Sequence, residues 1–174
     1  MPQHRLDTQS LLDRAAIHDV HTRYFQGIDA ANPDQVRSCF TDDVRAAYDG
    51  RADVEGIDAL MDSFFAFKKK ASGEWKVTSH FMGNLNFNSL EGDVAVTETY
   101  AIAFLVLAGK PTDQVAMRSL RYLDRLRRTP DGWRICDRVH TLDWSCQVPP
   151  TFAATMAQRR STPLPAREKG PGSN

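Results

Sequence analysis

Apolar residues recur at every fourth position near the start of the chain, which is typical of one face of a helix. This stripe consists of Leu12, Ala16, Val20, Tyr24 and Ile28, with Ile17 and Phe25 beside it. The pattern predicts a long helix over residues 7–32. Asp7 or Thr8 can cap its start, and Asn32 can adopt the left-handed conformation that often ends a helix. Pro33 suits the first turn of a short second helix over residues 33–40.

The next segment combines a brief strand with a further amphipathic helix. Residues 44–48 are predicted to form the strand, and Asp49-Gly50 a turn after it. Residues 56–71 are predicted to form the helix, whose apolar positions are Ile57, Leu60, Met61, Phe64, Phe65 and Phe67. Its last turn, Lys68-Lys69-Lys70, is expected to be solvated and favoured by the helix dipole.

After Gly73 the period of the apolar positions changes from helical to alternating. Four strands are predicted, over residues 75–90, 94–108, 115–127 and 133–146. Short turns with Gly, Pro or Asp separate them, which favours an antiparallel meander. Strands of this length normally coil and curve. Helices first and sheet afterwards predict an α+β fold with the helices gathered on one face of the sheet.

Composition limits the partners that the protein can have. The 174 residues, 41% of them apolar, suit a single domain, which we place at residues 1–158, with residues 159–174 a disordered, Pro-rich and basic tail. The 22 basic and 22 acidic residues cancel, so neither nucleic acid nor an anionic membrane surface is an expected partner. The first residues lack the features of an export signal, and we expect a cytoplasmic protein.

Motifs for several common chemistries are missing from the sequence. Neither the nucleotide-binding and serine-hydrolase signatures nor the zinc-protease signature occurs, and no cofactor is predicted. Cys39, Cys136 and Cys146 lack metal or disulfide spacing, so we interpret them as buried or half-buried small hydrophobic residues. His18 and His21 share a helical face without a third ligand, so they are interpreted as surface or half-buried histidines rather than as a metal site.

Three polar residues remain that stand among apolar neighbours: Tyr24, Asp29 and His80. An Asp29 carboxylate that accepts the Nδ1 proton of His80 would leave Nε2 free as a base. Tyr24 and Asp29 lie about 140° apart around a helix, so both can border one cavity only if it is wide or the helix end unwinds. The alternatives stay open: a structural His80, an Asp29 that caps the following loop, and a Tyr24 that belongs to the core.

Several segments together resemble the SnoaL-like family of the nuclear transport factor 2-like superfamily. They are Ala16–Tyr24 with Asp29, Cys39–Val44, Gly56–Leu60, His80–Asn84, Gly92–Ala95, Arg121–Leu126 and Asp131–Ile135 with Arg138. The resemblance covers residues 11 to 146. It implies a cone-shaped fold, in which a strongly bent antiparallel sheet is closed by helices over a deep, mainly apolar pocket.

The family resemblance also implies roles for individual residues. Tyr24, Asp29 and His80 resemble the catalytic set of the bile acid 7α-dehydratase type, and Asp29 with His80 resembles the dyad of scytalone dehydratase and hexachlorocyclohexane dehydrochlorinase. His80 would remove a proton from carbon, Asp29 would orient it, and Tyr24 would assist the departing hydroxyl or an activating carbonyl. Arg138, unless it is a surface arginine, and Met82 would contact the substrate in the pocket.

Two departures from these types shape the functional hypothesis. The dehydrochlorinase type carries a basic residue where Tyr24 stands, which disfavours a halide leaving group. Scytalone dehydratase uses a second histidine on a later strand, whereas residues 101–108 contain no ionisable side chain. We therefore expect a cofactor-independent lyase that dehydrates a hydrophobic cyclic molecule, such as a steroid or a polyketide-like alcohol. A non-catalytic binding or assembly subunit and an isomerase or polyketide cyclase are the alternatives.

Quaternary structure is also predicted by the resemblance. The apolar convex face of residues 94–108 suggests a homo-oligomer, with a trimer favoured and a dimer possible. Phe152 and Met156 are expected to lie in a short helix that closes the pocket or docks on a neighbouring subunit.

Overall fold

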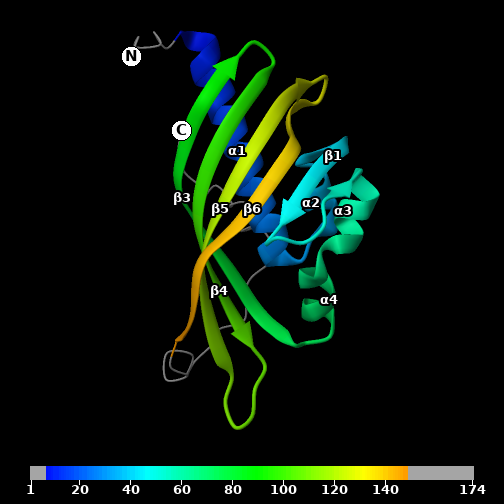
Figure 1. Ribbon diagram of the computed structural model, residues 1–174, viewed down its shortest axis with the longest axis vertical. Coiled ribbons are helices and arrows are strands. Elements are labelled where there is room, and N and C mark those ends of the chain that lie inside the picture. The colour runs from blue at the N-terminus through cyan, green and yellow to red at the C-terminus, as the bar shows by residue number, and fades with distance from the viewer. Residues whose placement is uncertain (1–6, 149–174) are drawn as a thin grey trace, which may run out of the picture.

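The computed structural model describes residues 7–148 as an α+β fold in which helices pack against one face of a curved sheet (Figure 1). Its elements are α1 (Thr8–Ala30), α2 (Pro33–Arg37), β1 (Phe40–Tyr48), β2 (Val54–Glu55), α3 (Ile57–Ser63), α4 (Phe65–Ala71), β3 (Trp75–Glu91), β4 (Val94–Leu107), β5 (Gln114–Thr129) and β6 (Gly132–Val148). The predicted tail at 159–174, Phe152 and Met156 lie outside the described residues.

The sheet has six strands in the order β2-β1-β6-β5-β4-β3, and it is open because β2 and β3 form its two edges. The predicted antiparallel meander is confirmed for β3 to β6. A brief strand was predicted over residues 44–48. The observed strand β1 starts at Phe40 and pairs in parallel with β6. Strands of 14 to 17 residues twist strongly along their length (Figure 1), so the sheet curves around the helical layer.

Helix α1 begins one residue after the predicted start, with Asp7 as its cap, and ends two residues before the predicted end. The Asp7 side chain accepts a hydrogen bond from the backbone N–H of Ser10, as a capping residue does. The left-handed residue at the other end is Ala31, with φ of 53°, rather than Asn32. Asn32 is extended because its side chain caps α2, where it accepts from the N–H of Gln35.

The buried face of α1 is offset from the predicted stripe. Leu12 is 60% exposed, whereas Asp13 and His21 are buried together with the apolar residues of the helix. The interpretation of His21 as a surface or half-buried residue was therefore wrong, because polar partners inside the core accommodate it. His18, one turn earlier, is exposed.

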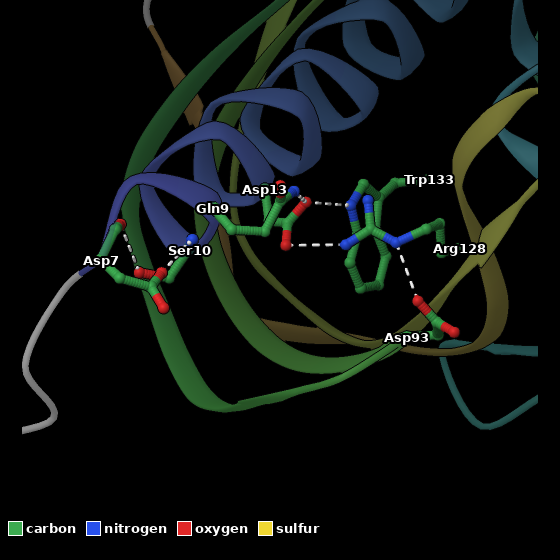
Figure 2. Close-up of polar contacts among 7 residues, drawn as sticks. All are labelled: Asp7, Gln9, Ser10, Asp13, Asp93, Arg128 and Trp133. Atoms are coloured by element: carbon green, nitrogen blue, oxygen red, sulfur yellow. Dashed lines mark hydrogen bonds and ion pairs between the residues drawn. The ribbon is translucent and has the colours of Figure 1, made fainter.

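A polar cluster explains why α1 starts with a buried carboxylate. Figure 2 shows Asp13 pointing at the end of the sheet, where it accepts hydrogen bonds from Trp133 Nε1 at 3.1 Å and from Arg128 at 2.7 Å. Arg128 in turn bonds Asp93 in the β3–β4 turn and lies over the Trp133 ring. Burial alone would raise the pKa of Asp13, but these donors lower it. The cluster holds the first turns of α1 against the strand ends.

The predicted helix over residues 56–71 is divided into α3 and α4 at Phe64. The backbone of Phe64 leaves the helical region with ψ of 83°, and its side chain is buried edge-on against Tyr48. The lysine run was predicted to be solvated, but Lys70 is half-buried. Its ammonium group donates to the carbonyls of Ile28 and Asp29 at the end of α1.

Other expectations about the surface have mixed outcomes. Cys39 is buried and Cys136 half-buried, but Cys146 is exposed because the last part of β6 extends beyond the core.

On the convex face, Tyr100 and Ile102 are 42% and 38% exposed. Among the described helices, none is long and apolar enough to cross a bilayer. The oligomeric state stays a prediction.

Candidate active site

A cavity of about 590 Å³, its open mouth included, lies between α1, the α3–α4 region and the concave face of the sheet. Its walls are mainly aromatic: Tyr24, Tyr48, Phe64, Phe65, Trp75 and Tyr122. Two histidines, His80 and His140, and two arginines, Arg51 and Arg118, also line it. The mixture of apolar walls with a few polar groups is typical of small-molecule sites.

Asp29 and His80 meet at one side of this cavity although 51 residues separate them in sequence. The Asp29 Oδ1 atom lies 2.7 Å from His80 Nδ1, and Oδ2 accepts the backbone N–H of His80 at 2.8 Å. Phe25 stacks on the imidazole with ring centroids 5.5 Å apart. The carboxylate thus fixes both the backbone and the ring of His80. Because an ionised carboxylate only accepts, Nδ1 carries the proton and Nε2 is the basic nitrogen.

The electrostatics of Asp29 keep it ionised. Its side chain and that of His80 are each only 8% exposed, and burial by itself would raise the pKa of Asp29. Hydrogen bonds from His80 and Thr78 outweigh burial, so the pKa is lowered below the ordinary value. The carboxylate is therefore available to balance a positive charge on the imidazole ring.

Helix α1 stays helical through Asp29, so the helix end does not unwind. Asp29 lies in the last turn of α1 and contacts Nδ1 and the backbone N–H of His80. Its carboxylate does not line the cavity. Tyr24 does line it, and its hydroxyl lies 3.3 Å from that of Tyr48. Burial raises the pKa of Tyr24 well above its usual range, so the phenol stays protonated and can donate a hydrogen bond.

Arg138 is neither a surface residue nor part of the cavity wall, and both sequence interpretations of it were wrong. Its guanidinium is fully buried and forms two 2.7 Å hydrogen bonds with Asp124, its cross-strand partner on β5. Its guanidinium carbon lies 4.1 Å from the centre of the Tyr24 ring. The arginine therefore packs against the face of the phenol. Met82 also does not line the cavity, because it is half-buried against the apolar core.

His140 is a cavity residue that the sequence analysis missed. It lies two positions after Arg138 on β6, stacks on Tyr48 and has its Nδ1 atom 2.9 Å from a carboxylate oxygen of Asp49. Burial lowers its pKa to about 4, so the ring is neutral at pH 7. The alternation of β6 around Arg138 could have indicated it. The partner Asp49 was interpreted only as a turn residue.

Across residues 7–148, no three His, Cys, Asp or Glu side chains are grouped closely enough to hold a metal ion. The arrangement at the cavity offers an oriented imidazole, neutral phenols and apolar walls, which together suit proton transfer to and from carbon.

Comparisons with known proteins agree with the fold. The protein Rv2910c of Mycobacterium tuberculosis, itself uncharacterized, is 33% identical over 136 residues, which are 78% of this chain and 89% of that protein. A hexachlorocyclohexane dehydrochlorinase, LinA type 2, superposes with a TM-score of 0.71 at 17% identity, over 90% of this chain and 100% of the other. A proposed scytalone dehydratase from Novosphingobium aromaticivorans gives 0.67 at 16% identity, over 91% and 97% of the two chains.

At such low identity the structural likeness establishes the fold alone. The sequence evidence goes further, because the model of the SnoaL-like domain matches residues 9–139, which is most of the chain. The chain therefore belongs to the SnoaL-like domain family.

Proposed function

We propose that the protein is a cofactor-independent lyase that removes water from a hydrophobic cyclic molecule, such as a steroid or a polyketide-like alcohol. The observation that carries this proposal is the 2.7 Å contact between Asp29 and His80, because it presents a basic Nε2 at the wall of an aromatic cavity. The similar folds of a dehydrochlorinase and a proposed dehydratase are compatible with elimination chemistry, although they share little sequence with this chain.

In the proposed reaction His80 takes a proton from carbon, and Asp29 stabilises the imidazolium that results. The electron pair of the broken C–H bond forms the new C=C bond as the C–O bond breaks. The departing hydroxyl leaves as water with the proton that His80 has taken up. Tyr24, kept neutral by burial, donates a hydrogen bond to the oxygen that gains charge.

The cavity walls support a flat, apolar substrate. Aromatic side chains from α1, β1, α4 and β5 surround the space, so a ring system can replace the water in it. Exclusion of water strengthens the electrostatic effect of Asp29 and the phenols on the reacting atoms. A single positioned base contributes about 10² to 10⁴ in rate, so the rest of the rate enhancement must come from Asp29, the phenols and the cavity walls.

The experiment is a panel of cyclic β-hydroxy ketones, incubated with wild-type protein in D₂O and read by mass spectrometry. A dehydratase yields a product lighter by one water. His80→Ala is expected to lower turnover by about 10² to 10⁴ while the protein still unfolds cooperatively. His18→Ala removes an exposed histidine of α1 and serves as the matched control, with turnover unchanged.

Other outcomes separate the alternatives. A product that has lost no water, whose only mass change is deuterium taken up at carbon, and that disappears in His80→Ala, would assign isomerase or cyclase chemistry to the same base. Ligand binding without any turnover would support a non-catalytic binding subunit. A His80→Ala variant as active as wild type contradicts the proposed mechanism.

We also propose that the protein is a homo-oligomer, with a trimer favoured over a dimer. The exposed apolar side chains of Val94, Tyr100 and Ile102 on the convex face support this proposal. Sedimentation at micromolar concentration tests it, and a monomer would contradict it.

A further inference from the structure

Arg118 lies in the same row of the sheet as His80. His80 on β3 is paired with Ala103 on β4, and Ala103 is paired with Arg118 on β5. Directly paired residues of an antiparallel sheet point to the same face, and all three line the cavity. Two strand spacings place the Cα atoms of His80 and Arg118 about 10 Å apart. Only the small side chain of Ala103 stands between the imidazole and the guanidinium.

Three of the five arginines of β5 are paired with acids, and Arg118 is not one of them. The strand contains Arg118, Arg121, Arg125, Arg127 and Arg128. Arg121 pairs with Asp143 and Glu98, Arg127 with Asp43, and Arg128 with Asp13 and Asp93.

Neither Arg118 nor Arg125 has an ion pair with another residue of the 7–148 region. Arg125 is exposed to solvent, whereas Arg118 is half-buried at the wall of an aromatic cavity. A guanidinium stays charged at any physiological pH, and charge in such a place calls for an anionic partner. A bound ligand is the component that could supply it.

We propose that Arg118 is the carboxylate-binding residue of this cavity, and that the substrate is a cyclic carboxylic acid. The flat ring lies between the aromatic walls, the reacting carbon faces His80, and the carboxylate accepts hydrogen bonds from the Arg118 guanidinium. This inference rests on the proposed function only for the role of His80. It also replaces the predicted role of Arg138, whose guanidinium is already bound to Asp124.

Arg51 is the other positive group at the cavity, and the experiment must separate it from Arg118. Its Nε atom donates to the carbonyl of Tyr48, and its guanidinium lies 5.3 Å from the centre of the Phe65 ring. Arg51 is exposed, so solvent screens its charge more than that of the half-buried Arg118. We therefore expect Arg51 to contribute less to carboxylate binding.

The test compares two probes of the same shape, 2-naphthoate and 2-naphthamide, by isothermal titration calorimetry at pH 7. Wild-type protein is expected to bind the carboxylate about tenfold more tightly than the amide, as for a charge-assisted pair. Arg118→Met is expected to remove this preference and to leave amide binding within about twofold. Arg118→Lys is expected to retain part of it, because the charge remains while the planar fork is lost.

Arg125→Met is the matched control, since it removes a positive charge from the same strand at an exposed position. Equal binding of the two probes by wild type, no binding of the carboxylate, or an unchanged preference in Arg118→Met overturns the proposal. Loss of the preference in Arg51→Met instead of Arg118→Met also overturns it. Ala103→Val provides a second variant in case Arg118→Met does not fold, because added bulk between the two side chains should weaken carboxylate binding.

His80→Ala keeps the two proposals distinguishable. It is expected to lower turnover by about 10² to 10⁴ but to preserve the preference for 2-naphthoate. Failure of the lyase proposal therefore leaves the binding result standing, and failure of the binding result leaves the role of His80 untouched.

Discussion

Asp29 with His80 and Asp124 with Arg138 and His21 are two clusters of similar residue types in very different surroundings. In the first, both side chains are 8% exposed and one imidazole nitrogen faces a cavity. In the second, every side chain is fully buried.

The environment of His21 completes the second cluster. Its Nδ1 lies 3.5 Å from Asp124, and its Nε2 lies 3.3 Å from the hydroxyl of Thr97. No nitrogen of that ring is directed at open space. The comparison teaches that the residue types alone do not define a catalytic pair, because the chemistry requires one ring nitrogen to be left for a substrate.

The largest expected effect is on the buried cluster. Asp124→Asn removes the negative charge that compensates Arg138, and a broken buried ion pair costs about 3 to 5 kcal/mol of unfolding free energy. Urea unfolding measures this loss. Asp43→Asn removes an exposed partner of Arg127 and should leave stability nearly unchanged. An equal effect of the two substitutions would erase the distinction between buried and exposed pairs.

Asp29→Asn tests the cavity cluster by its activity rather than by its stability. The amide can still contact His80, but it cannot stabilise a positive imidazolium, so turnover of an accepted substrate should fall about a hundredfold. Urea unfolding should remain cooperative. If Asp29→Asn destabilised the protein as much as Asp124→Asn while turnover were kept, the pair would be structural.

The two clusters should also respond differently to acid. Burial lowers the pKa of His21 to about 4, below the ordinary 6.5 of an unfolded histidine. The unfolded chain therefore takes up a proton first as the pH falls from 7 to 5, and the protein should lose about 2 kcal/mol of unfolding free energy for this histidine.

His21→Gln should show a smaller loss over the same range, and urea unfolding at the two pH values provides the measurement. For Asp29 the effect has the same sign but lies in a more acid pH range. Its pKa is lowered in the folded protein, so its contribution is present at pH 5 and is lost only below the ordinary pKa of a carboxyl group. A stability that did not change between pH 7 and pH 5 would contradict the assignment for His21.

The smallest expected effect concerns the phenol between the two clusters. Tyr24 faces the cavity above the Arg138 guanidinium, so Tyr24→Phe removes one hydrogen bond to the reacting oxygen and keeps the ring in place. Turnover should fall about tenfold, with about 1 kcal/mol or less of change in unfolding free energy. Steady-state kinetics and urea unfolding together check this, and unchanged turnover would remove Tyr24 from the mechanism.

The antiparallel meander could be predicted because alternation and short turns define β3 to β6. The residues alone left the Asp29–His80 contact as one of several interpretations, and only the family resemblance favoured it. The parallel pairing of β1 with β6 could not be predicted in this way, because it joins segments about 90 residues apart with no short turn between them. The contact of His140 with Asp49 depends on the same pairing, so it could not be predicted either.

The two arginines show a second limit. Arg138 and Arg118 both stand in strands, and the residue spacing does not show which one faces an acid. The answer depends on the cross-strand register, which pairs Arg138 with Asp124 and Arg118 with Ala103. That register includes an irregularity between Arg125 and Leu126, which no local pattern indicates.

The pairing of His80, Ala103 and Arg118 in one row limits how the gene can change in length. Deletion of a single codon within β3 before His80 would shift the histidine to the opposite side of the sheet. The connection between β4 and β5, which lies beyond the paired row, can accept extra codons without this penalty. Insertions and deletions among relatives that keep the same chemistry should therefore gather in that connection and avoid β3.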